Sequence, residues 1–248
     1  MSIKEFVLHA FRRLFQTKDG KTENQEYPKL IVYQENPEAG PKNFSEKIAR
    51  EKKGDTFEWP NMVALNKAVA RFIGDEKKIV NIGTGTGTFE WFVSVDRSLQ
   101  LVASEFDEEC VRWCKEHRQR ENICYCSYDM KELRKRFGKF DLSLAIDVIE
   151  HIGNYGIFLR DFSQLADRAI ITTPNKARSV ETLTSPPAYY QHVREWTAGE
   201  FYWILKIFYS QVEMYSMPDI YLPDVTKISL LSTMTPLIAI CSKSSHEH

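Results

Sequence analysis

The chain has 248 residues, 43% of them hydrophobic, which is enough for one α/β domain with additions. Its 33 basic and 34 acidic residues nearly balance, so it lacks the basic excess of a general nucleic-acid-binding protein. The five cysteines have no zinc-ligand spacing and no apolar run approaches the ~20 residues that span a bilayer, so we expect a cytoplasmic protein with free thiols and no transmembrane segment.

Residues 1–75 are expected to form a helical extension and a candidate substrate lid, ahead of a main domain over 76–248. Within 3–15 the apolar side chains share one helical stripe, which could pack on the chain's own domain, pair two copies as a homodimer, or lie on an anionic membrane surface. Residues 17–45 are polar and interrupted by prolines, as in a loop or mobile lid. A helix with a proline in its first turn is predicted over 60–72.

From residue 78 onward, strand-like runs alternate with helical ones. Seven strand-like runs lie at 78–83, 100–105, 122–126, 140–146, 168–173, 211–215 and 236–241. Alternation at this spacing predicts a doubly wound, Rossmann-like α/β sheet of mostly parallel strands. The last run follows its predecessor without a clear helix, and a hairpin of these two strands would be antiparallel.

Residues 79–89 read Ile-Val-Asn-Ile-Gly-Thr-Gly-Thr-Gly-Thr-Phe, so a β-branched run ends in Gly83, Gly85 and Gly87. This pattern is typical of a buried parallel strand that turns tightly into a helix and leaves bare backbone for a ligand. A dinucleotide fingerprint would need its third glycine one position later, where this chain has Thr88. A plain tight turn is the alternative interpretation.

Acidic residues follow the next three strands. Glu105 comes about 20 residues after the glycine turn, where a carboxylate can accept both ribose hydroxyls of an adenosine. It could also be an acid in the first turn of the next helix. Asp129 follows the third strand, where Asp is a common helix cap. The fourth strand leads into Asp147-Val-Ile-Glu150-His151.

Together these motifs resemble the class I S-adenosylmethionine-dependent methyltransferases, as does Thr173-Pro-Asn175 at the end of the fifth strand. The resemblance covers about residues 78–215 and implies a seven-stranded sheet with an antiparallel last strand. It implies S-adenosylmethionine as cofactor, with Glu105 on its ribose and Asp129 on its adenine. The residues expected to bind this cofactor are Asn81, Gly83, Thr84, Gly85, Gly87, Glu105, Phe106, Asp129, Met130 and Asp147.

One position departs from the family pattern. The family usually has Asp or Glu where this chain has Asn81, and that side chain contacts the methionine amino group of the cofactor. An asparagine can still hydrogen-bond this group, but it brings no charge against an ammonium. Either other acids compensate, or the affinity for the cofactor is modest.

Two histidines are candidate general bases. Methyl transfer from a sulfonium is an in-line displacement, and a hydroxyl acceptor must also lose its proton as the oxygen attacks. His192 and His151 both follow strand ends on the side where the ligand should lie. The segment 189–197 around His192 resembles one found in methyltransferases of saccharide and small-molecule pathways. The alternative is that His192 and Arg194 only fasten this loop to the sheet.

A metal is the other interpretation of the same residues. Asp147, Glu150 and His151 have i, i+3, i+4 spacing and could converge on one divalent ion. Ubiquinone-pathway O-methyltransferases and small-RNA 3′-end 2′-O-methyltransferases use a similar run, and the latter have a later histidine that His192 could imitate. Many metal-free members carry the same run, so we expect no metal from sequence alone.

The sequence therefore predicts O-methylation of a small molecule or saccharide by S-adenosylmethionine, without general nucleic-acid binding. A metal-assisted 2′-O-methyltransferase of RNA 3′ ends is one alternative. A methyltransferase-fold binding protein that has lost catalysis is the other.

Overall fold

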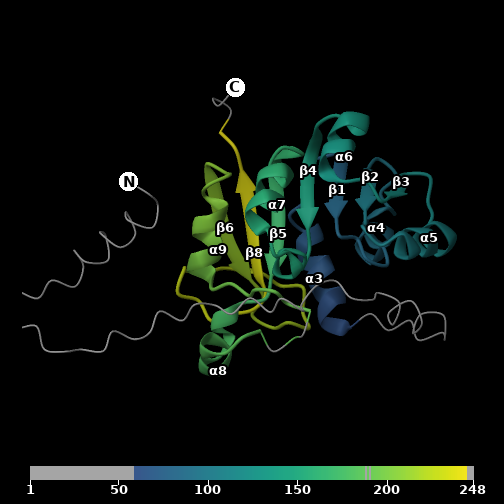
Figure 1. Ribbon diagram of the computed structural model, residues 1–248. Coiled ribbons are helices and arrows are strands. Elements are labelled where there is room, and N and C mark those ends of the chain that lie inside the picture. The colour runs from purple at the N-terminus through teal and green to yellow at the C-terminus, as the bar shows by residue number, and fades with distance from the viewer. Residues whose placement is uncertain (1–58, 188, 190, 245–248) are drawn as a thin grey trace, which may run out of the picture. The chain divides into compact units, whose positions relative to one another are not determined.

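Figure 1 shows the computed structural model, which describes residues 59–187, 189 and 191–244. The expected helix over 3–15, its candidate homodimer contact and the polar segment 17–45 lie outside the described residues. Within the described ranges, no helix is both long and apolar enough to cross a membrane.

A single mixed sheet runs through the described domain. Its strands are β1 (Lys78–Ile82), β2 (Gln100–Ser104), β3 (Ile123–Cys126), β4 (Phe140–Ala145), β5 (Ala166–Thr173), β6 (Gln211–Ser216), β7 (Thr226–Lys227) and β8 (Leu237–Ser242). They lie in the order β3-β2-β1-β4-β5-β8-β6-β7. The first five strands pair with one another in parallel, while β8 is antiparallel to both β5 and β6.

This topology confirms the Rossmann-like, mostly parallel sheet with an antiparallel last strand. It differs from the expected seven strands by the short β7, which pairs with Tyr215 and Ser216 of β6. Two residues carry too little alternation of apolar and polar side chains to be recognised as a strand from sequence.

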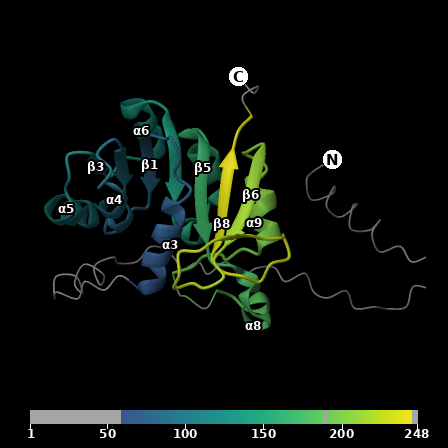
Figure 2. The ribbon, with the colours of Figure 1, turned by 180° about the vertical axis from the view of Figure 1, so that it is seen from behind.

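Helices connect the strands and cover both faces of the sheet. They are α3 (Pro60–Ala70), α4 (Thr88–Val93), α5 (Glu108–His117), α6 (Met130–Phe137), α7 (Tyr155–Phe162), α8 (Val180–Thr184) and α9 (Ala198–Leu205), with the 3₁₀ turns η1 (Ile149–His151) and η2 (Lys176–Arg178). Side chains of successive strand residues point to opposite faces. Ile79 accordingly packs with α3, α4 and α5, whereas Val80 packs with α6, α7 and α9. Figure 2 views the sheet from the side of α3.

The parallel strands all end at one edge of the sheet, which is where ligands bind in open α/β folds. In Figure 1 the arrowheads of β4 and β5 point to the end of the sheet where α8 lies. The loops after β1, β2, β4 and β5 therefore meet there, and they carry the glycines, Glu105, Asp147 and Asn175. Asn175 is buried and ties this edge to the segment before β8 by donating to the carbonyls of Ser232 and Met234.

Candidate active site

The glycine loop after β1 has the backbone that its spacing predicts. Gly83, Gly85 and Gly87 have φ angles of 76°, 55° and 71°, a region that L side chains rarely adopt. A Cβ added at Gly83 would lie 2.6 Å from Cγ2 of Val148, and one at Gly87 would lie 2.8 Å from the hydroxyl of Tyr125. A side chain at Gly83 or Gly87 would therefore force its neighbour to move, and glycine leaves bare backbone at the ligand edge of the sheet.

Gly83→Ala should therefore destabilise the fold. We expect the free energy of unfolding to fall by about 2 kcal/mol, because the left-handed backbone is strained by a Cβ and Val148 must move. Urea unfolding followed by circular dichroism measures the change. Gly153→Ala is the matched control, since a Cβ there meets nothing within 4 Å. Equal unfolding midpoints for the two variants would contradict this interpretation of the loop.

Glu105 reaches from the end of β2 to the glycine loop. Its side chain is buried, and Oε2 accepts a hydrogen bond from the amide of Gly85 at 2.8 Å. Oε1 accepts from the amides of Phe106 at 2.9 Å and Asp107 at 3.3 Å. Burial raises the pKa of Glu105, and these three backbone hydrogen bonds oppose the rise. The carboxylate thus braces the loop from the strand that should hold a ribose. The acids in the first turn of α5 are Glu108 and Glu109 instead, and Asp107 caps this helix by accepting from the amides of Glu109 and Cys110.

The other predicted cofactor residues lie at the same edge with different surroundings. Phe106 is 62% exposed beside the loop. Asp129 is exposed and caps α6 by accepting from the amide of Glu132 at 2.8 Å, and Met130, the first residue of that helix, is half-buried. The capping alternative for Asp129 is therefore real, and it leaves the second carboxylate oxygen for a ligand. Thr84 and Asn81 both bond to Glu90, a residue that sequence reasoning missed.

Asp147 follows β4 in a strained conformation. With φ at 51°, it is the one non-glycine residue in the described part of the chain with a positive φ. Its amide donates to the hydroxyl of Thr172 at 2.9 Å, and that hydroxyl donates to Oδ1 of Asp147 at 2.6 Å. Burial raises the pKa of Asp147. Strain of this kind is kept where surrounding contacts impose it, and here it aims a carboxylate into a cavity.

The next turn, η1, brings Glu150 and His151 to His192. One ligand atom from each of the three lies within 4.8 Å of the others. The His151 and His192 rings meet edge to face, with centroids 4.9 Å apart. The backbone carbonyl of Glu150 accepts from the amides of Val193 and Arg194 at 2.7 and 3.1 Å. These backbone contacts fasten the loop to η1, and the Arg194 side chain adds hydrogen bonds to Tyr155 and Glu200.

Glu150 is fully buried at the centre of this group. Its Oε2 accepts from the hydroxyl of Thr173 at 3.1 Å, while Oε1 has no hydrogen-bond partner among the residues that the structure describes. Burial raises the pKa of Glu150 well above its usual value, and the neighbouring Asp147 adds to the rise. An orphaned buried carboxylate oxygen is costly unless a cation or a proton meets it.

Both imidazoles are oriented by a protein oxygen on Nδ1. His151 Nδ1 lies 2.9 Å from the backbone carbonyl of Gln191, and His192 Nδ1 lies 2.9 Å from Oε1 of Glu195. Each contact places the ring proton on Nδ1 and leaves the Nε2 lone pair for a ligand. Burial lowers the pKa of His151, which favours its neutral, ligating form.

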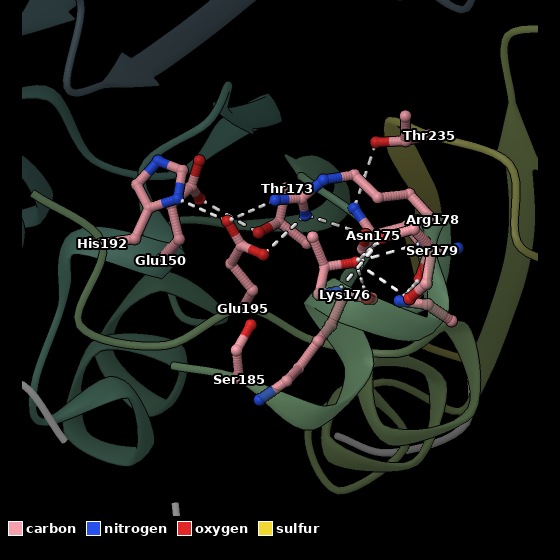
Figure 3. Close-up of polar contacts among 12 residues, drawn as sticks. Glu150, Thr173, Asn175, Lys176, Arg178, Ser179, Ser185, His192, Glu195 and Thr235 are labelled. Atoms are coloured by element: carbon pink, nitrogen blue, oxygen red, sulfur yellow. Dashed lines mark hydrogen bonds and ion pairs between the residues drawn. The ribbon is translucent and has the colours of Figure 1, made fainter. Parts of the chain in front are cut away.

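Glu195, which contacts His192, is itself held in place by an ion pair with Arg178. As Figure 3 shows, Glu195 lies between His192 and Arg178, and Arg178 contacts both of its oxygens, at 2.6 and 3.3 Å. Burial opposes ionisation of Glu195, but the hydrogen bonds from His192 and Arg178 prevail and lower its pKa. Neither Glu195 nor Arg178 was a predicted site residue. Glu195 lies in the segment 189–197 that the sequence singles out around His192, but no sequence pattern pointed to Arg178.

A cavity of about 480 Å³ opens beside this cluster. Asp147, His192 and Glu195 form part of its wall. The remaining wall is largely apolar and includes Met62 and Leu65 of α3, Pro174, Ile220 and Pro236. The cavity therefore lies at the carboxyl edge of the sheet, and its volume and apolar wall suit a small organic ligand.

The predicted site residues thus fall into two groups at one edge. Those around the glycine loop are the ones predicted to bind the cofactor, and they surround the bare backbone of Gly83, Gly85 and Gly87. The other group assembles Glu150, His151 and His192, with Asp147 beside it. Of the candidate metal set Asp147, Glu150 and His151, the last two meet His192, the later histidine of the metal alternative, whereas Asp147 is not among the three whose ligand atoms lie within 4.8 Å of one another.

Comparison with known proteins identifies the family of this domain. Residues 60–208 match the model of a methyltransferase domain family. The chain is similar in fold to an S-adenosylmethionine-dependent methyltransferase from Thermotoga maritima, a possible histamine N-methyltransferase, at 12% identity and a TM-score of 0.59, covering 79% of this chain and 97% of that one. It is similar to the plantazolicin methyltransferase BpumL in complex with S-adenosylhomocysteine, at 13% identity and a TM-score of 0.58, with 82% and 92% covered.

A third similar structure is the methyltransferase domain of bacterial CtHen1-C, at 18% identity and a TM-score of 0.55, with 75% of this chain and 98% of that one covered. Comparison with curated protein sequences finds no match. The strand order defines a Rossmann-like domain with a glycine loop at its ligand edge. The chain belongs to the class I S-adenosylmethionine-dependent methyltransferases, and S-adenosylmethionine is its cofactor.

Proposed function

We propose that this protein is an O-methyltransferase that holds a divalent cation between Glu150, His151 and His192 and methylates a hydroxyl of a small molecule or saccharide. The observation that carries the proposal is the orphaned, buried Oε1 of Glu150 beside two imidazoles whose Nδ1 atoms are both occupied. A bare imidazole base would need no buried carboxylate at this point. Two nitrogen ligands and carboxylate oxygens suit Mn²⁺, Fe²⁺ or Zn²⁺.

The reaction would be an in-line displacement. The acceptor oxygen attacks the methyl carbon, the carbon–sulfur bond breaks, and its electron pair stays on sulfur. A divalent cation at the cluster would lower the pKa of a hydroxyl placed beside it. Asp147 lines the same cavity, and burial raises its pKa, so its carboxylate is the group suited to accept the hydroxyl proton. Arg178 and Glu195 keep His192 in its ligating orientation.

The cavity supports a small acceptor. Its apolar wall of Met62, Leu65, Ile220 and Pro236 would exclude water from the transfer. Arg178 also lines the cavity, but its charge is matched by Glu195. A polyanion such as RNA would instead need lysine or arginine side chains whose charge is free to contact its phosphates.

The experiment is methyl transfer from S-adenosylmethionine carrying a tritiated methyl group. The protein is incubated with a metabolite extract and separately with total RNA, each with and without EDTA. We expect label in the small-molecule fraction, as base-stable ether, and its loss when EDTA is present. If instead the RNA fraction carries the label and EDTA removes it, the acceptor is RNA and the small-molecule proposal is wrong. Transfer that EDTA leaves unchanged would overturn the cation, and no transfer to either fraction would favour a binding protein.

A further inference from the structure

A second buried carboxylate contacts the end of β1 and the glycine loop, and it is separate from the group of Glu150, His151 and His192. Glu90, in the first turn of α4, is 1% exposed. Its Oε1 accepts a hydrogen bond from Nδ2 of Asn81 at 2.6 Å, and its Oε2 accepts one from the hydroxyl of Thr84 at 2.5 Å. Because both oxygens act as acceptors, the contacts fit the ionised form.

This charge has no counter-ion in the described part of the chain. No lysine, arginine or histidine there forms an ion pair with Glu90. Burial raises its pKa, the hydrogen bonds from Thr84 and Asn81 oppose the rise, and the nearby Glu105 adds to it. Two buried carboxylates, those of Glu90 and Glu105, are unfavourable when no cation lies near them. A cationic ligand bound beside Glu90 would offset this electrostatic cost.

The contact with Glu90 also decides how the Asn81 amide is turned. The opposite orientation would bring its oxygen against a carboxylate oxygen, so Nδ2 must face Glu90 and Oδ1 must face away. Oδ1 is buried and has no hydrogen-bond partner among the described residues. Asn81 lies two residues before Gly83, so this unused acceptor lies next to the glycine loop that is predicted to bind the cofactor.

We propose that Asn81 and Glu90 together replace the acid that the family usually carries at the end of the first strand. Oδ1 of Asn81 accepts a hydrogen bond from the methionine ammonium of S-adenosylmethionine. Glu90 acts as a positioning residue: it turns the Asn81 amide and supplies the negative charge, and Thr84 holds its second oxygen. The proposal concerns the methyl donor and is independent of the acceptor and the cation.

Calorimetric titration with two ligands tests this pair. S-adenosylmethionine carries the ammonium, whereas 5′-methylthioadenosine has the same nucleoside and no amino-acid tail. Glu90→Gln keeps the size of the side chain and removes its charge. We expect it to weaken S-adenosylmethionine binding about tenfold and to leave 5′-methylthioadenosine binding unchanged. Glu116→Gln, an exposed acid on α5, is the control and should change neither.

A charge exchange separates this role from a purely structural one. The double variant Asn81→Asp/Glu90→Gln moves the carboxylate to position 81 and keeps one acid and one amide in the pair. It should bind S-adenosylmethionine within about threefold of the parent protein. If Glu90→Gln alone fails to fold, as judged by thermal unfolding, the double variant still gives the decisive comparison. Unchanged S-adenosylmethionine binding in Glu90→Gln, equal weakening of both ligands, or a double variant without recovery would overturn the proposal.

Discussion

Glu150→Gln is expected to lower the rate of methyl transfer at least about a hundredfold while leaving the affinity for S-adenosylmethionine unchanged. The substitution keeps the shape of the side chain and its bond to Thr173, but it replaces the orphaned carboxylate oxygen that we assign to the cation. Initial rates with the labelled donor measure the first effect, and calorimetry measures the second.

Thermal unfolding provides the control for Glu150. The carboxyl group is buried and its pKa is raised by that burial, so the neutral amide should not destabilise the empty protein. Glu116→Gln again serves as the matched substitution and should retain full activity. A Glu150→Gln protein that folds, binds the donor and transfers methyl groups at the parent rate would rule out a chemical role for this carboxylate.

Glu105→Ala should produce the largest loss of donor binding. The substitution removes the predicted acceptor for the ribose hydroxyls and also the brace on the amide of Gly85. Hydrogen bonds to a charged group contribute about 1.5–3 kcal/mol each, so we expect the dissociation constant to rise about a hundredfold. Calorimetry should find the same loss for S-adenosylmethionine and 5′-methylthioadenosine, since both carry the ribose.

This common loss distinguishes Glu105 from Glu90, whose variant should spare 5′-methylthioadenosine. A Glu105→Ala protein that binds either ligand with the parent affinity would refute the ribose assignment. If the two ligands lose affinity to different extents, Glu105 contacts a part of the cofactor other than the ribose.

The parts of the site that sequence could predict depend on local geometry. The positions of Gly83, Gly85 and Gly87 require a left-handed backbone, and only glycine adopts it cheaply, so their spacing alone indicated the loop. Glu105 was predictable because consecutive parallel strands end at the same edge of the sheet.

The parts that sequence could not predict depend on contacts between distant segments. His151 and His192 meet only because two backbone amides after His192 bond to the carbonyl of Glu150. The link from Glu195 to Arg178 joins two loops in the same way. No periodicity encodes such contacts, and the two-residue β7 was too short to show any.

Asp129 shows how one residue can satisfy two patterns. An acid after the third strand suits both a helix cap and an adenine contact, and its spacing is the same for either. The structure supplies the cap, since Oδ1 accepts from the amide of Glu132. Its adenine contact stays a prediction.

The proposed reaction depends on a divalent cation held by Glu150, His151 and His192. Titration with Mn²⁺, followed by electron paramagnetic resonance of the free ion, measures this binding and needs no acceptor. The parent protein should bind one Mn²⁺ per chain, and His192→Ala and Glu150→Gln should each abolish this binding while Glu116→Gln retains it. Absence of bound Mn²⁺ in the parent protein, or equal binding in all four proteins, would contradict the proposed cation site.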